Sequence, residues 1–180
     1  MKEMATILAE INQVMAEVKE DQLVAAIELL VNSKRIFVLG EGRSGLQGKG
    51  FAMRLMHIGM PVFVIGESTT PSIQPGDTLV AISGSGTTST IVSLTEKAKK
   101  NNVKILGVTS SENSPLAKLS ATPLIIPGAT KTGSGLKSIQ LLSSLFDQTL
   151  HITLDYVCLM MSKKMEISNS QANQQHSNME

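Results

Sequence analysis

One short segment of the chain combines the residue types that bind an anion. In Ser83-Gly-Ser-Gly-Thr-Thr88, two glycines stand among four hydroxyl side chains. Glycines let the backbone approach an anion closely, hydroxyls donate hydrogen bonds, and the first amides of a following helix point outward unpaired. We therefore predict a phosphate-binding loop, and its members are Ser83, Gly84, Ser85, Gly86, Thr87 and Thr88.

The anion that suits this loop is small. A nucleotide-binding P-loop has a lysine directly after its last glycine, and here Thr87 follows Gly86 instead. A monophosphate therefore suits the loop better than a nucleoside triphosphate. The alternative is an ordinary helix cap, but four hydroxyls are more than a cap requires.

A second glycine-rich segment, Gly40-Glu-Gly-Arg-Ser-Gly45, matches the dinucleotide pattern G-x-G-x-x-G, and Glu67 falls near the expected ribose-binding acid. A nicotinamide cofactor would, however, leave the hydroxyl-rich loop without a role. The chain is also too short for a second nucleotide-binding half and a substrate domain. We favour the alternative in which Gly42, Arg43 and Ser44 contact a small polar substrate and Glu67 anchors hydroxyl groups or the loop.

Both segments lie between a predicted strand and a predicted helix. Short apolar runs rich in β-formers predict strands, and apolar residues at helical spacing predict helices. The predicted strands are 35–39, 61–65, 77–82, 103–108 and 122–126. The predicted helices are 3–19, a second one capped by Asp21, 46–58, 87–100, 114–119 and about 136–164, and residues 128–135 form a Gly/Thr/Ser loop.

Strands that alternate with helices indicate an α/β fold, here a three-layer αβα domain with a five-stranded parallel sheet. The flavodoxin-like strand order 2-1-3-4-5 is expected for this count. In that order the sheet reverses between strands 1 and 3, and ligands bind in the crevice at their carboxyl ends. The two glycine-rich segments follow these two strands, so we expect them to form one site.

Composition excludes several classes of function. A net charge of +1 and 3% aromatic residues argue against a nucleic-acid or membrane partner. The single cysteine, Cys158, excludes an internal disulfide and a cysteine-rich zinc site. No targeting or membrane-spanning segment is apparent, so a cytoplasmic location is expected.

Several longer motifs resemble one known family. They are Gly42-Arg-Ser-Gly-Leu, Phe51-Ala-Met-Arg-Leu-Met-His57-Ile-Gly59, Val64-Ile-Gly-Glu67, Ile82-Ser-Gly-Ser-Gly-Thr87, Ser144-Leu-Phe-Asp-Gln148 and His176-Ser-Asn-Met-Glu180. Together they resemble the sugar isomerase (SIS) domain family, and within it the 6-phospho-3-hexuloisomerases. The resemblance covers nearly the whole chain.

The resemblance implies a reaction in the ribulose monophosphate pathway of formaldehyde assimilation or detoxification. D-arabino-hex-3-ulose 6-phosphate would become fructose 6-phosphate through an enediolate, without a cofactor or metal. The family also implies a homo-tetramer that works beside a hexulose-6-phosphate synthase. The alternatives are a SIS isomerase for arabinose 5-phosphate or a heptose phosphate, and a non-catalytic protein that senses sugar phosphates.

The resemblance further implies roles for individual residues. The catalytic base would be Asp147, where the family usually has Glu, with Gln148 beside it in the substrate site. His176 would act as acid or base, and Glu67 is a second candidate carboxylate. Apart from the resemblance, two lysines lie in and after the Gly/Thr/Ser loop, and of these Lys137 is a candidate for reaching the phosphate and Lys131 is assigned to solvent.

The domain organisation follows from the same comparison. Residues 1–165 are expected to form a single SIS domain with an N-terminal helical pair. Residues 166–180 form a polar tail that would otherwise be expected to be disordered. By resemblance, this tail is expected to dock at an active site, that of an adjacent subunit being one option.

Overall fold

The computed structural model describes residues 1–133 and 135–179. Ser134, in the predicted Gly/Thr/Ser loop, and Glu180, in the predicted tail, lie outside the described residues. The elements are α1 (Lys2–Glu17), α2 (Glu20–Val31), β1 (Ile36–Gly40), α3 (Gly42–His57), β2 (Val62–Val64), β3 (Thr78–Ile82), α4 (Ser89–Lys100), β4 (Lys104–Thr109), α5 (Pro115–Leu119), β5 (Thr122–Ile125), α6 (Ser144–Lys164) and α7 (Asn169–Gln174).

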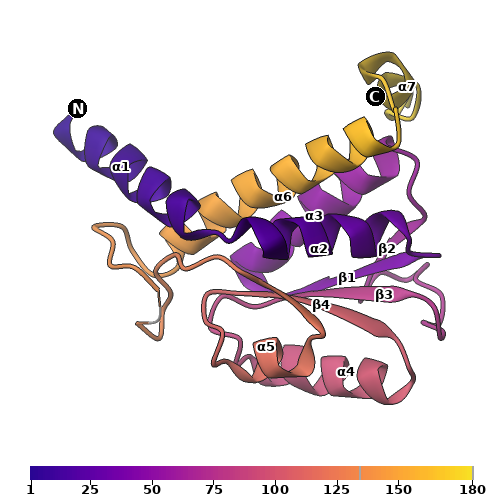
Figure 1. Cartoon of the computed structure of the whole chain (residues 1–180), viewed down its shortest axis with the longest axis horizontal. Coiled ribbons are helices and arrows are strands. Elements are labelled where there is room, and N and C mark those ends of the chain that lie inside the picture. The colour runs from indigo at the N-terminus through magenta and orange to yellow at the C-terminus, as the bar shows by residue number, and fades with distance from the viewer. Residues whose placement is uncertain (134, 180) are drawn as a thin grey trace.

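The predicted sheet is confirmed. Its strand order is β2-β1-β3-β4-β5, and every neighbouring pair is parallel. On β1, Val38 pairs with Val64 of β2 on one side and with Val80 of β3 on the other. Figure 1 shows α2, α3 and α6 over one face of the sheet and α4 and α5 over the other. The three-layer α/β architecture is therefore the predicted one.

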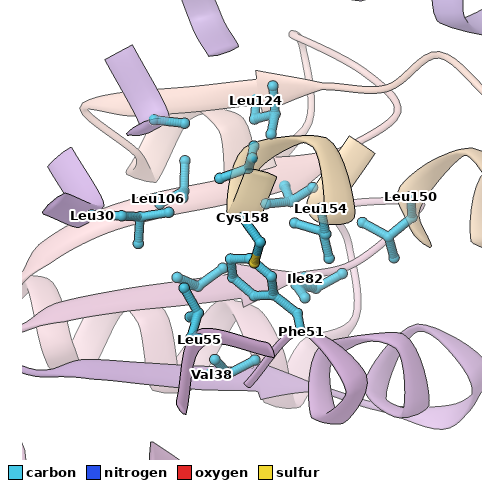
Figure 2. Packing of buried hydrophobic residues seen from close by; sticks show 14 of the residues in the cluster. Leu30, Val38, Phe51, Leu55, Ile82, Leu106, Leu124, Leu150, Leu154 and Cys158 are labelled. Atoms are coloured by element: carbon cyan, nitrogen blue, oxygen red, sulfur yellow. The ribbon is translucent and has the colours of Figure 1, made fainter. Parts of the chain in front are cut away.

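The larger hydrophobic core lies between the sheet and α2, α3 and α6. Figure 2 shows side chains from these helices converging on side chains of β1, β3, β4 and β5. The labelled members are Leu30, Val38, Phe51, Leu55, Ile82, Leu106, Leu124, Leu150, Leu154 and Cys158. Burial raises the pKa of the Cys158 thiol to about 12, so this cysteine stays protonated and unreactive.

The reversal of the sheet lies where the sequence predicts it. β1 leads into α3 on one face, and β3, its neighbour in the sheet, leads into α4 on the other face. The two connections therefore diverge around a crevice at the carboxyl ends of β1 and β3. This is the place where a doubly wound sheet binds its ligands.

Two helices begin at positions other than those predicted. The helix expected over 46–58 starts at Gly42, whose φ of 58° turns the chain from β1 directly into α3. Arg43 and Ser44 therefore lie in the first helical turn instead of a free loop. The helix expected from about residue 136 starts only at Ser144. Leu142 has a φ of 57°, which a right-handed helix does not accept.

The polar tail contains a short helix, α7. Ser168 caps it, with Gln171 completing a reciprocal capping box. Figure 1 shows α7 at one end of α6 and residues 136–143 at the other end. Among the described residues, no helix has both the length and the apolar character needed to cross a membrane.

Candidate functional site

A cavity of about 390 Å³ opens at the carboxyl ends of β1 and β3. Its walls come from both glycine-rich segments and from the chain between β5 and α6. The lining residues are Glu41, Gly42, Arg43, Ser44, Ile82, Ser83, Gly84, Ser85, Thr88, Thr130, Lys131, Thr132, Leu142 and Ser143. The expectation that the two segments form one site is confirmed.

The hydroxyl-rich loop is held by its own hydrogen bonds. The Ser83 and Thr88 hydroxyl oxygens lie 2.9 Å apart. The Ser85 hydroxyl accepts from the Thr87 amide at 3.3 Å and from the Thr87 hydroxyl at 3.0 Å. The Gly86 amide donates to the Ser83 carbonyl and hydroxyl oxygens. Gly86 and Thr87 thus shape the loop, whereas Ser83, Gly84, Ser85 and Thr88 line the cavity.

Two helix N-termini meet at this cavity. The residues Glu41 and Thr88, which precede α3 and α4, make no side-chain capping hydrogen bond. The first amides of both helices therefore keep their donor capacity, and the positive end of each helix dipole favours an anion nearby.

Two cationic side chains also line the cavity, and one was not expected there. Arg43 stands on the first turn of α3, as predicted, and Lys131 comes from the Gly/Thr/Ser loop. The prediction for the lysines was wrong, since Lys131 lines the cavity and Lys137 does not. Both lysine side chains are exposed to solvent, and of the two only Lys131 is among the residues that line the cavity.

Asp147 lies directly behind the cavity wall, on the first turn of α6. Its side chain is fully buried. One carboxylate oxygen accepts from the Ser44 hydroxyl at 2.8 Å, and the other accepts from the Ser143 hydroxyl at 3.0 Å. The Arg43 Nε lies 3.6 Å from the second oxygen. Because Arg43, Ser44 and Ser143 all line the cavity, the Asp147 carboxylate is one side chain away from a bound ligand.

Two other predicted residues make contacts that keep them off the cavity wall. The side-chain amides of Gln148 and Gln140 exchange two hydrogen bonds, at 2.9 and 2.8 Å. Glu67 follows β2 and is exposed, and its carboxylate accepts from the Lys49 ammonium of α3 at 2.6 Å. Neither Gln148 nor Glu67 lines the cavity of its own chain.

His176 lies with α7 at the far end of α3. Its ring stacks on the buried ring of His57, with 5.2 Å between the ring centroids. Burial lowers the pKa of His57, and the nearby Arg54 and His176 lower it further. The cavity is at the first turn of α3 and His57 is at its last, so about 24 Å of helix separates them. The structure therefore does not bring His176 to the cavity of its own chain.

Sequence reasoning missed part of the cavity wall. Thr130, Lys131 and Thr132 lie in a segment whose glycines and hydroxyls resemble those of the phosphate loop, a signal that was available. Leu142 and Ser143 offer no such signal, because the sequence around them has the apolar pattern of a helix interior. Within residues 1–133 and 135–179, no three His, Cys, Asp or Glu side chains gather as a metal site would require.

Comparison with known proteins places this site in a family. The family model described as the SIS domain matches residues 29–152, which include both glycine-rich segments and Asp147. A protein of Mycobacterium gastri named 3-hexulose-6-phosphate isomerase is 40% identical over 95% of this chain and 86% of its own. A protein of the same name from Bacillus subtilis is 34% identical over 98% of this chain and 96% of its own.

A solved structure agrees with these relatives. The hypothetical protein from Methanococcus jannaschii, whose crystal structure is described as inferring a molecular function of 3-hexulose-6-phosphate isomerase, superimposes with a TM-score of 0.87. It is 28% identical, and the match covers 100% of both chains. The sheet order, the site at its reversal and these likenesses lead to one conclusion: the chain belongs to the SIS domain family.

Proposed function

We propose that this protein is a phosphosugar isomerase that converts D-arabino-hex-3-ulose 6-phosphate to D-fructose 6-phosphate. The observation that carries the proposal is the cavity itself. The hydroxyl-rich loop before the uncapped helix α4 lines it, and so do Ser44 and Ser143, which hydrogen-bond the buried carboxylate of Asp147. The sugar is suggested by the relatives from Mycobacterium gastri and Bacillus subtilis, which bear the name 3-hexulose-6-phosphate isomerase.

In this proposal the phosphate group binds between the two helix N-termini. The Ser83, Ser85 and Thr88 side chains and the first amides of α4 would donate to its oxygens. Lys131, which also lines the cavity, would supply positive charge to the phosphate. The sugar carbons would then extend toward Ser44 and Ser143, in front of Asp147.

The reaction moves a carbonyl from C3 to C2 of the sugar. Asp147 would act on C2 through the Ser44 hydroxyl, which takes up the C2 proton as it gives its own to the carboxylate. The C2–H electron pair would form the C2=C3 bond of an enediolate as the C3 carbonyl becomes an oxyanion. The proton of the C2 hydroxyl then passes to the C3 oxygen, C2 becomes the carbonyl, and C3 gains the proton that Asp147 holds. Arg43, which lines the cavity beside Asp147, would stabilise the oxyanion. No atom is gained or lost, so no redox partner is needed.

His176 enters the proposal as the acid or base of a neighbouring subunit's site. Its position beside His57, about one α3 length from its own cavity, supports a role between subunits. The polar tail, residues 166–180, would then dock where an adjacent chain presents its cavity. Glu67 is exposed and does not line the cavity of its own chain. It therefore remains the alternative catalytic carboxylate, and it too would act at the site of a neighbouring subunit.

The assembly that this requires is a homo-oligomer, which we propose to be a tetramer. α3 and α6 pack against each other, and each presents large apolar side chains to solvent. They are Leu46, Met53 and Met56 on α3 and Ile152, Tyr156 and Leu159 on α6, here called the α3–α6 apolar face. An apolar face of this kind on a helix pair suits burial against a second copy.

Tyr156→Glu is expected to reduce the assembly to a smaller species. Tyr156 is at the centre of the exposed stripe on α6, and a carboxylate there would be desolvated in the interface without a partner. Size-exclusion chromatography with light scattering measures the mass. Ser93→Glu introduces the same charge at an exposed position of α4, on the other side of the sheet, and as the control it is expected to keep the wild-type mass. An unchanged mass for Tyr156→Glu would show that this face is not the interface.

The proposed activity is tested in a coupled reaction. The protein is mixed with a hexulose-6-phosphate synthase, formaldehyde and ribulose 5-phosphate, and fructose 6-phosphate is followed through coupled NADPH formation. We expect NADPH formation well above that of the synthase alone. The synthase is also the proposed functional partner, and the single cysteine of this chain supports a reducing, cytoplasmic setting.

Assays with other sugars and ligands separate the alternatives. Product from arabinose 5-phosphate or a heptose phosphate, with none from the hexulose, would indicate another SIS isomerase. Binding of fructose 6-phosphate without turnover of any of these sugars would indicate a sugar-phosphate sensor. A thermal shift on addition of NAD, with none from the sugars, would favour the nicotinamide alternative.

A further inference from the structure

We propose that Glu10 on α1 is a positioning residue, which holds the segment between β5 and α6 so that Leu142 and Ser143 form one wall of the cavity. This inference deepens the proposed function and rests on it for its kinetic consequences. α1 is far from the glycine-rich segments in sequence, and nothing in its composition indicated a link to the site.

Both carboxylate oxygens of Glu10 are engaged by this segment. The Ser138 hydroxyl donates to one oxygen at 2.6 Å, and the Ile139 amide donates to the other at 2.8 Å. Burial raises the pKa of Glu10, but hydrogen bonds from Ser138, Ile139 and Gln140 lower it further than burial raises it, so the pKa is below its ordinary value. Glu10 is therefore ionised at neutral pH, and its hydrogen bonds are of the stronger, charge-assisted kind.

Further hydrogen bonds connect the Glu10 contacts to the cavity wall. The Ser138 hydroxyl also accepts from the Gln140 amide at 2.9 Å. Gln140 in turn exchanges two side-chain hydrogen bonds with Gln148 on α6. Three residues beyond Gln140, the Ser143 hydroxyl donates to Asp147, the carboxylate behind the cavity wall. Glu10 is thus the first of a set of tethers that ends at the proposed base.

The segment needs such tethers because its own backbone does not hold it. Residues 136–143 form neither helix nor strand. Leu142 lines the cavity with a φ of 57°, a left-handed conformation that the Cβ of leucine disfavours. Its side chain is largely exposed, so little packing offsets this cost. Loss of the hydrogen bonds from Ser138 and Ile139 to Glu10 would let Leu142 leave the left-handed conformation. Ser143, the next residue, would then move away from Asp147.

The test combines a kinetic and a structural measurement on the full chain. Glu10→Ala is expected to lower kcat about 10- to 100-fold, because small displacements of groups around a reacting centre have effects of this size. KM is expected to change little, since the phosphate loop is untouched. Hydrogen–deuterium exchange is expected to become faster in residues 136–143 while the rest of the chain keeps its protection. Glu17→Ala, an exposed glutamate of the same helix, is the control and is expected to behave as wild type.

Two more variants keep the test decisive. Glu10→Gln retains an oxygen that can accept from the Ile139 amide, and it is expected to recover most of kcat. Ser138→Ala removes one of the tethers from the other side, and combined with Glu10→Ala it is expected to add less than its separate effect. If Glu10→Ala lowers Tm and speeds exchange throughout the chain, the residue is merely structural and the inference fails. Exchange and kcat equal to those of Glu17→Ala would also overturn it.

The failure of the proposed function would look different. In that case the wild-type protein shows no turnover of the hexulose phosphate, but the exchange measurement still reports on the tether. Faster exchange confined to residues 136–143 in Glu10→Ala would then support the positioning of the cavity wall. Unchanged exchange there would refute it, whatever the substrate.

Discussion

Asp147→Asn is expected to lower kcat by about 10²- to 10⁴-fold, the range that a positioned general base contributes. The amide has nearly the shape of the carboxylate but cannot take up a proton from C2 of the sugar. The coupled assay measures kcat, and a titration with fructose 6-phosphate measures binding. KM and binding of fructose 6-phosphate are expected to change little, because the phosphate contacts lie on the Ser83–Thr88 loop.

The surroundings of Asp147 make this variant informative. An asparagine at this buried position retains one oxygen, which can still accept from Ser44 at 2.8 Å or from Ser143 at 3.0 Å. Both hydroxyls can also turn to accept from the new amide. The fold is therefore expected to survive, and a loss of turnover would report on the chemistry.

Asp155→Asn provides the matched control. Asp155 lies on the same helix, is exposed, and faces His151 one turn away at 3.5 Å. Its replacement is expected to leave kcat unchanged. Asp147→Glu adds a second test, because its carboxylate would reach about 1.5 Å further toward the cavity. It is expected to remain active, because it keeps a carboxylate that can accept from Ser44 and Ser143.

One outcome would overturn the assignment of the base. If Asp147→Asn keeps normal turnover, Asp147 serves only to hold Ser44 and Ser143 in place. Glu67 then becomes the leading candidate, and Glu67→Gln would be expected to lose the activity instead.

Gly86→Ala is expected to abolish phosphosugar binding and to lower the free energy of unfolding by at least about 2 kcal/mol. Gly86 has a φ of 65°, and a Cβ there would lie 2.4 Å from the Ser114 side chain and 2.7 Å from the Thr109 hydroxyl. Its amide donates to Ser83 and its carbonyl accepts from the Leu116 amide of α5 at 3.1 Å. The loop cannot move away from the clash without giving up the bonds that shape it.

Substitutions at two other glycines separate the steric clash at Gly86 from the backbone strain of its positive φ. Gly50 lies within α3, and a Cβ there would meet nothing within 4 Å, so Gly50→Ala is expected to be neutral or to stabilise by about 0.5–1 kcal/mol. Gly42 has a φ of 58° but equally open surroundings, so Gly42→Ala isolates the backbone strain, about 1–2 kcal/mol. Denaturant unfolding and titration with fructose 6-phosphate measure the series. Gly86→Ala with the stability and affinity of Gly50→Ala would show that the loop is not rigidly held.

Much of the fold could be predicted from the sequence because its signals are local. Short apolar runs such as 103–108 predict buried strands because they are too short for buried helices. The glycine-rich turns at Gly40 and Gly84 mark the carboxyl ends of the first and third strands. Once five strands alternate with helices, few topologies remain, and the known rule for sheet reversal places the site. The anion loop was predicted residue by residue, since its chemistry belongs to six consecutive positions.

The rest of the site could not be predicted, because it depends on contacts between distant positions. α6 starts at Ser144, after the left-handed Leu142, and the segment before it is hydrogen-bonded to Glu10, more than a hundred residues away. The hydrophobic periodicity of one segment does not indicate a hydrogen-bonding partner so distant in the sequence. The sequence by itself determined the strands and the glycine- and hydroxyl-rich turns that follow them, because local side-chain patterns specify both, and the strand order followed from the precedent of flavodoxin-like sheets. Only the tertiary structure decided that Asp147 lies behind two serines, that Lys131 faces the cavity and that His176 lies beside His57, because long-range packing sets those neighbours.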